Sequence, residues 1–161
     1  MRTPMPSRRT LRSLLRRLAA VPAVLYELGL GRLLAHRFLM VVHRGRLRRT
    51  VLEVIAWDGR AREAVVIADL GPDPDPHSDL LAGGAEEVRI GAQRFRPWVR
   101  RLKGEEAFAV FSEFERRNRL LMPLARPVVS RLAGLPYDGS PAARRRLLER
   151  MPLLALSDRR A

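Results

Sequence analysis

Four arginines stand close together in a short, glycine-containing segment between two apolar runs of the chain. They are Arg44, Arg46, Arg48 and Arg49. Guanidinium groups bind phosphate and carboxylate oxygens through paired N–H donors, with a geometry that lysine cannot match. A short link with this much positive charge therefore predicts an anionic ligand.

The apolar runs on either side of these arginines predict a β-hairpin. Residues 38–42 and 51–56 are rich in β-branched and aromatic side chains, as strands are. After a predicted two-residue turn at Asp58 and Gly59, residues 63–68 have the composition of a third strand. Three consecutive strands with short links indicate an antiparallel meander.

The rest of the chain predicts more strands and then helices. Residues 71–84, with three prolines, predict a crossing loop that holds at most a turn or two of helix near 78–82. A second hairpin is expected from residues 87–90 and 93–102, and a last strand from 152–156, which makes about six strands. Helices are expected over 105–118, irregularly over 120–135, and over 141–150, with Ser140 as N-cap and Pro141 in the first turn.

Length and composition indicate one domain, and the first residues form a basic segment. The 161 residues include no cysteine, and the net charge is +14 with Lys103 as the only lysine. Residues 1–22 contain a basic amphipathic helix, whose leucines either dock on the domain or lie on an anionic membrane. We expect residues 23–158 to form one domain, and 159–161 a tail. The histidines His36, His43 and His77 lack the spacing of metal ligands, so no metal site is predicted.

A family resemblance emerges from several motifs in order. The motifs are HRGRLRRTVLEV (43–54), VVIADLG (65–71), VRIGAQRFRPWVRRL (88–102), a helix opened by Glu105, GLPYDGS (134–140) and MPLLALSD (151–158). Together they resemble the deazaflavin-dependent nitroreductase family, whose members are split β-barrel oxidoreductases found mainly in actinobacteria. The resemblance implies an α+β split β-barrel with flanking helices, and a cytoplasmic protein that is either free or peripheral at the inner face of the membrane.

The resemblance also implies a cofactor site and a substrate position. Its cofactor would be the deazaflavin coenzyme F420, with FMN less expected, and its substrate a small electron-poor molecule that accepts a hydride. The matching cofactor-binding positions are Arg44, Arg46, Arg48, Arg49, Thr50, Val51, Leu52, Ala68 and His77. Tyr137 stands where the family brings aromatic residues near the substrate. Tyr137 and His77 each have a plain alternative, since Tyr137 would equally pin a loop to the core and His77 would be an exposed loop residue.

Three departures from the family pattern fall on the cofactor site, and one is that the register of the family's Asp-Trp-Tyr-x-Asn-Leu helix reads DPHSDL at residues 75–80. The arginine link lacks the family's Arg/Lys-Ser-Gly element, and Asp69 and Leu70 replace polar or glycine positions after the third strand. An aspartate there would repel an acidic ligand. A cofactor-free relative that acts as a binding or structural protein is therefore the alternative function. The charge also suggests nucleic acid, but with no recognised DNA or RNA motif we expect no specific nucleic-acid partner.

Overall fold

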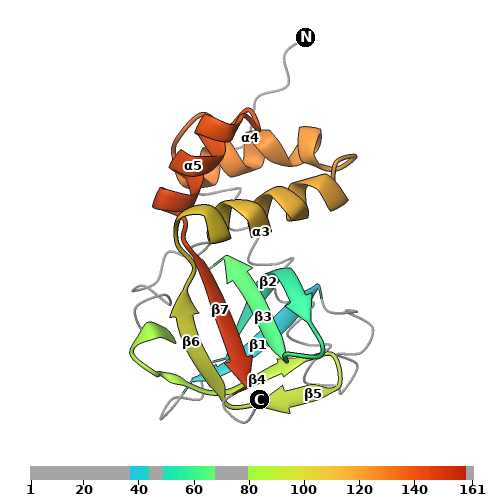
Figure 1. Cartoon of the computed structure of the whole chain (residues 1–161), viewed down its shortest axis with the longest axis vertical. Coiled ribbons are helices and arrows are strands. Elements are labelled where there is room, and N and C mark those ends of the chain that lie inside the picture. Colours follow the sequence, from blue (N-terminus) through green and yellow to red (C-terminus); the bar gives the residue numbers. More distant parts are fainter. Residues whose placement is uncertain (1–36, 44–48, 68–79, 159–161) are drawn as a thin grey trace.

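The fold combines an antiparallel sheet with a layer of helices. The computed structural model describes residues 37–43, 49–67 and 80–158, and Figure 1 shows three helices at one end of a seven-stranded, nearly closed, barrel-like sheet. The predicted α+β class is confirmed at this level. The predicted N-terminal helix, the tail, Ala68 and most of the loop at 71–84 lie outside the described residues.

The elements follow one another as strands first and helices later. The strands are β1 (Phe38–His43), β2 (Arg49–Asp58), β3 (Glu63–Ile67), β4 (Ala85–Ile90), β5 (Gln93–Phe95), β6 (Pro97–Arg101) and β7 (Leu153–Asp158). The helices are α3 (Gly104–Arg117), α4 (Met122–Ala133) and α5 (Pro141–Arg150). All neighbouring strands are antiparallel.

The order of the strands explains the curvature of the sheet. Across the sheet the order is β5-β4-β1-β2-β3-β7-β6, so β5 and β6 stand at opposite edges. Yet only Arg96 separates these two strands in the sequence. The sheet must therefore curl until its edges meet at Arg96, as a sheet does when it closes toward a barrel.

The β1-β2-β3 meander is confirmed, but the turn after β2 is longer than predicted. Residues 59–62 form the link, instead of a two-residue turn. The Asp58 carboxylate accepts hydrogen bonds from the backbone N–H groups of Ala61 (3.1 Å) and Arg60 (2.8 Å), which stabilises this wider turn. The same hydrogen bonds lower the pKa of Asp58.

The prediction of one strand over residues 93–102 is wrong, and this is why the sheet has seven strands. Arg96 separates β5 from β6, and the two strands pair with different partners, β4 and β7. Pro97 has no N–H to donate and restricts the residue before it, so it favours a break at this point. The break lets one apolar run serve both edges of the sheet.

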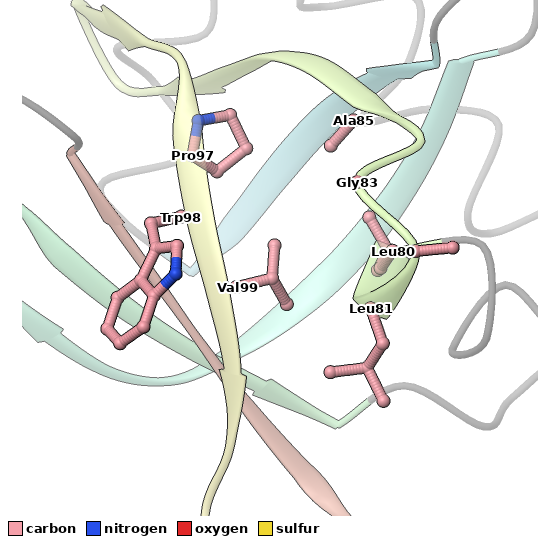
Figure 2. A pocket seen from close by; sticks show the side chains of 8 residues that line it. Leu80, Leu81, Gly83, Ala85, Pro97, Trp98 and Val99 are labelled. Atoms are coloured by element: carbon pink, nitrogen blue, oxygen red, sulfur yellow. The ribbon is translucent and has the colours of Figure 1, made fainter.

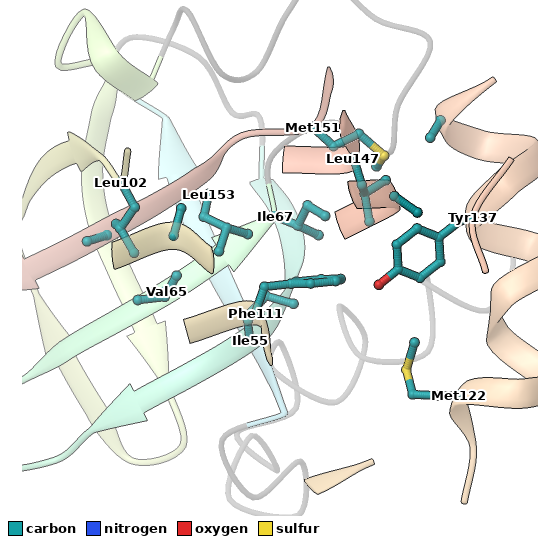
Figure 3. Packing of buried hydrophobic residues seen from close by; sticks show 14 residues of the cluster. Ile55, Val65, Ile67, Leu102, Phe111, Met122, Tyr137, Leu147, Met151 and Leu153 are labelled. Atoms are coloured by element: carbon teal, nitrogen blue, oxygen red, sulfur yellow. The ribbon is translucent and has the colours of Figure 1, made fainter. Parts of the chain in front are cut away.

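Two neighbouring strands are buried on both faces and so divide the core in two. Alternate residues of β3 and β7 contact different layers, which is why both strands are continuous apolar runs. The barrel interior contains Leu39, Val41, Leu52, Val54, Ala64, Val66, Leu80, Ala85, Val88, Ile90, Phe95, Leu154 and Leu156. The other cluster joins the sheet to the helices, and Figure 3 shows Phe111 and Leu147 reaching toward Ile67 and Leu153.

The helices agree with the sequence prediction to within a residue or two. Glu105 and Glu106 stand in the first turn of α3, where the helix dipole favours acids. Glu106 also accepts two hydrogen bonds from Arg100 of β6, at 3.0 and 2.7 Å. Helix α4 starts late and contains Pro127, as expected, while Ser140 caps α5 by accepting from the Ala143 N–H at 3.2 Å.

Candidate functional site

The sheet has a seam where strands β4 and β6 come close without pairing. β4 pairs with β5 only from Val88 to Ile90, and β6 pairs only with β7. The first half of β4, from Ala85 to Glu87, therefore has a strand neighbour on one side only. We call the gap between residues 85–87 and residues 97–99 the seam.

A pocket of about 250 Å³ occupies the seam. Its walls are the turn before β4 and the first half of β6, and Figure 2 shows them facing each other across the gap. The lining residues are Leu80, Leu81, Ala82, Gly83, Ala85, Pro97, Trp98 and Val99. Val99 points toward Leu80, while Trp98 lies on the other side of β6 with 54% of its surface exposed. The Trp98 ring therefore does not cover the pocket (Figure 2).

The described lining residues offer a ligand uncharged contacts only. Among the described residues that line the pocket, none carries a charged side chain, so the backbone N–H and C=O groups are the polar atoms that face a ligand. The lining side chains are uncharged, but polar atoms make up most of the accessible surface, so a flat organic ligand would find both apolar contacts and hydrogen-bond partners. An anionic group of such a ligand would have to be bound outside the pocket.

The ends of the arginine link lie at this same end of the sheet. Ala85 of the pocket wall pairs with His43, the last residue of β1, and Val42 pairs with Arg49, the first residue of β2. Two strand spacings of 4.7–4.9 Å separate β4 from β2, which is about 10 Å. Arg49 is exposed. Arg44, Arg46 and Arg48 lie outside the described residues, between His43 and Arg49.

The other predicted cofactor positions on β2 have different surroundings. Thr50 is half-buried, and its Oγ1 lies 3.0 Å from Nε2 of His43, which is itself only 4% exposed. Leu52 belongs to the barrel interior, and Val51 is half-buried on the opposite face of the strand. The structure thus adds His43, a residue that the sequence analysis set aside, to the predicted Arg49 and Thr50. Its position opposite Ala85 depends on strand register, which the sequence does not encode locally.

Arg62 fastens the corner where the seam begins. Its guanidinium lies 2.6 Å from Oδ2 of buried Asp158, at the end of β7. It also donates to the Gln93 side chain (3.3 Å) and the Arg94 carbonyl (3.2 Å) of β5, and lies over the Phe95 ring. These contacts tie β5 to β7 beside Pro97, so the sheet edges are joined at the corner and diverge along the pocket.

Tyr137, the predicted substrate residue, belongs to the helix layer. It is 5% exposed, and its hydroxyl donates to Glu115 of α3 at 2.5 Å. Arg144 of α5 donates to the other oxygen of the same carboxylate at 2.6 Å and to the Gly139 carbonyl at 3.2 Å. These contacts support the alternative interpretation of Tyr137, in which it pins the loop between α4 and α5 to the core. Tyr137 does not line the seam pocket.

The remaining predicted site residues, Ala68 and His77, lie outside the described residues. Among the residues that the structure describes, no group of three or more His, Asp or Glu is arranged to hold a metal ion. The sequence analysis missed the pocket because its walls come from two segments that only the curled sheet brings together. No local sequence signal marks the pocket, since even the exposure of Trp98 is seen only in the structure.

Comparison with known protein families and with curated proteins finds no match to this sequence. Within the described part of the chain, no helix is long and apolar enough to cross a membrane.

Proposed function

We propose that this protein is a split β-barrel oxidoreductase that uses a deazaflavin cofactor to transfer a hydride to a small electron-poor substrate. The observation that carries the proposal is the position of the seam pocket, whose wall at Ala85 pairs with His43, one residue before the arginine link. A pocket with uncharged described walls, beside concentrated positive charge, suits a ligand with a flat ring system and an anionic tail. The motif order that resembles the deazaflavin-dependent family supports the same ligand.

In this proposal, charged residues bind the cofactor's tail and apolar residues pack against its ring. Arg44, Arg46, Arg48 and Arg49 would bind the phosphate and carboxylates of the tail, while Val99 and Leu80 would contact the ring. A reduced deazaflavin is itself a two-electron hydride donor, so the protein needs only to bind, orient and shield. The side chains of His43, at the end of β1, and Thr50, near the start of β2, lie 3.0 Å apart. This contact would fix the direction in which the link leaves the sheet.

The volume of the pocket favours a second candidate function. A pocket of 250 Å³ is smaller than the roughly 300–1,000 Å³ typical of sites that enclose a drug-sized ligand. A cofactor-free relative, acting as a binding protein for a smaller apolar molecule, would need no more room. Asp69 and Leu70, at positions where the family has polar or glycine residues, support this candidate too.

A titration of the purified protein with deazaflavin separates the two functions. We expect binding in the micromolar range for the wild type, followed by cofactor fluorescence. The double variant R48A/R49A should bind at least about 100-fold more weakly, because it loses two charge-assisted hydrogen bonds of about 1.5–3 kcal/mol each. Arg150→Ala, which removes an exposed arginine of α5, is the control for net charge and should bind as the wild type does.

Failure to bind at tens of micromolar would overturn the deazaflavin proposal and leave the cofactor-free candidate. If binding occurs, reduced deazaflavin should be oxidised by a nitroaromatic acceptor only in the presence of the protein. Binding without this turnover would restrict the protein to a cofactor-binding role.

A further inference from the structure

Three of the exposed leucines gather at one turn of the helix layer. Five large apolar side chains are exposed in the described part of the chain, and two of them, Leu81 and Trp98, line the seam pocket. The other three are Leu120 (83% exposed), Leu121 (54%) and Leu124 (78%), at the turn between α3 and α4. Scattered surface leucines need no explanation, but a cluster indicates a contact surface.

The backbone presents these leucines together. Leu120 and Leu121 end the turn before α4, and Leu124 lies in the first turn of α4, so the three leucines flank the start of this helix. The turn is ordered, since the Leu124 N–H donates to the Leu121 carbonyl at 3.1 Å. Met122 between them is buried and anchors the turn to the core. Figure 1 shows this turn at the end of α3 that lies away from β6.

Three exposed arginines come directly before the leucines in the chain. Arg116, Arg117 and Arg119 precede them within one turn of chain and are all exposed. Glu113, which pairs with both Arg116 (2.7 Å) and Arg117 (3.4 Å), is the one acidic residue of 113–126 on the surface, because Glu115 is buried against Arg144. The rim therefore keeps a net charge of +2, three arginines less one glutamate.

We propose that this turn docks on an anionic membrane surface, with the three leucines inserted among the lipids and the three arginines at the headgroups. An apolar tip with a cationic rim fits the boundary between acyl chains and acidic headgroups, which attracts basic residues and buries apolar ones. A second copy of this chain is a poorer fit, because it would bring the two arginine rims against each other.

The test uses the full chain and vesicles of phosphatidylcholine with and without phosphatidylglycerol, at about 150 mM salt, where weak surface attraction is screened. The wild type should sediment with the anionic vesicles and not with the neutral ones. The variant L120S/L121S/L124S keeps every charge and should partition at least about tenfold less. Leu81→Ser, the matched control at another exposed leucine, should partition as the wild type does.

A fluorescent reporter locates the inserted residue. Tryptophan emission of Leu120→Trp should shift to the blue on anionic vesicles, and that of Leu81→Trp should not. Equal sedimentation of the triple variant and the wild type would overturn the proposal. It would also be overturned if L11S/L14S/L15S/L18S abolished binding, since the N-terminal segment would then be the contact. A wild-type dimer that the triple variant converts to a monomer, with unchanged vesicle binding, would assign the leucines to self-association instead.

Discussion

The sheet is covered completely where the helices pack on it, and it stays open at the seam between β4 and β6. Where α3 and α5 cover the sheet, an apolar cluster is sealed by a polar network in which Glu115 accepts from Tyr137 and Arg144. At the seam, β4 and β6 face each other across a pocket whose described lining residues have no charged side chain. The helix layer thus carries much of the stability, and the seam is the part free to bind a ligand. Substitutions at the two boundaries should therefore change different measured quantities.

The strongest test of this contrast is Glu115→Gln. Its side chain is 8% exposed, and its loss would leave the Arg144 guanidinium buried without a counter-charge. Removing one partner of such a pair costs about 3–5 kcal/mol, so we expect that loss in the free energy of unfolding by denaturant. Glu113→Gln is the control on the same helix, since its ion pairs are exposed and should contribute about 0–1 kcal/mol. Equal losses in the two variants would contradict the assigned role of the network.

A smaller loss in the free energy of unfolding is expected when Arg62, which joins β5 to β7, is replaced. Arg62→Met removes the ion pair with Asp158 and the hydrogen bonds to β5. Because Arg62 is partly exposed, we expect a loss of about 1–3 kcal/mol in the free energy of unfolding, with faster amide exchange in β5. Arg94→Met, on the exposed side of the same strand, should change neither quantity. Unchanged exchange in β5 of Arg62→Met would show that the corner holds without Arg62.

Filling the pocket should affect binding more than stability. Val99 points into the seam, so Val99→Phe should lower deazaflavin affinity at least about tenfold, while the free energy of unfolding falls by no more than about 1–3 kcal/mol. Val99→Ala is the matched comparison at the same position, because it widens the pocket and should lower the affinity much less than Val99→Phe does. Binding of deazaflavin to Val99→Phe with wild-type affinity would place the ligand elsewhere.

The smallest expected effect is a pH dependence from the helix layer. Burial, and then the neighbouring Glu115 carboxylate, raise the pKa of the Tyr137 hydroxyl above its ordinary value of about 10. The folded protein then keeps a proton that the unfolded chain loses, so this stabilisation is present below about pH 10 and is lost as pH rises beyond it. The free energy of unfolding should fall by about 1 kcal/mol per pH unit above pH 10.

In Tyr137→Phe, the free energy of unfolding should no longer fall in this way above pH 10. Tyr26 is the only other tyrosine, and Tyr26→Phe should keep the wild-type pH dependence. If Tyr26→Phe loses it instead, the titrating hydroxyl is not the one in the helix layer.

Local sequence signals predicted the elements better than they predicted the site. Ser140 followed by Pro141 fixes the start of α5 because cap and first-turn preferences act over a few residues. The break at Pro97 was missed because an apolar run does not reveal which strands it pairs with. The partners of Arg62 and Tyr137 were inaccessible for the same reason, since each joins segments more than 20 residues apart. Of the cofactor site that we propose, the arginines were predicted from the sequence, and the pocket was found only in the structure.

Amide hydrogen exchange with and without deazaflavin tests the central claim most directly. If the seam and the arginine link form one ligand site, the cofactor should slow exchange in residues 80–88, in residues 97–99 and around the link from 43 to 50. Exchange in α3, α4 and α5 should stay the same. Protection confined to the helices, or none at saturating cofactor, would contradict the account.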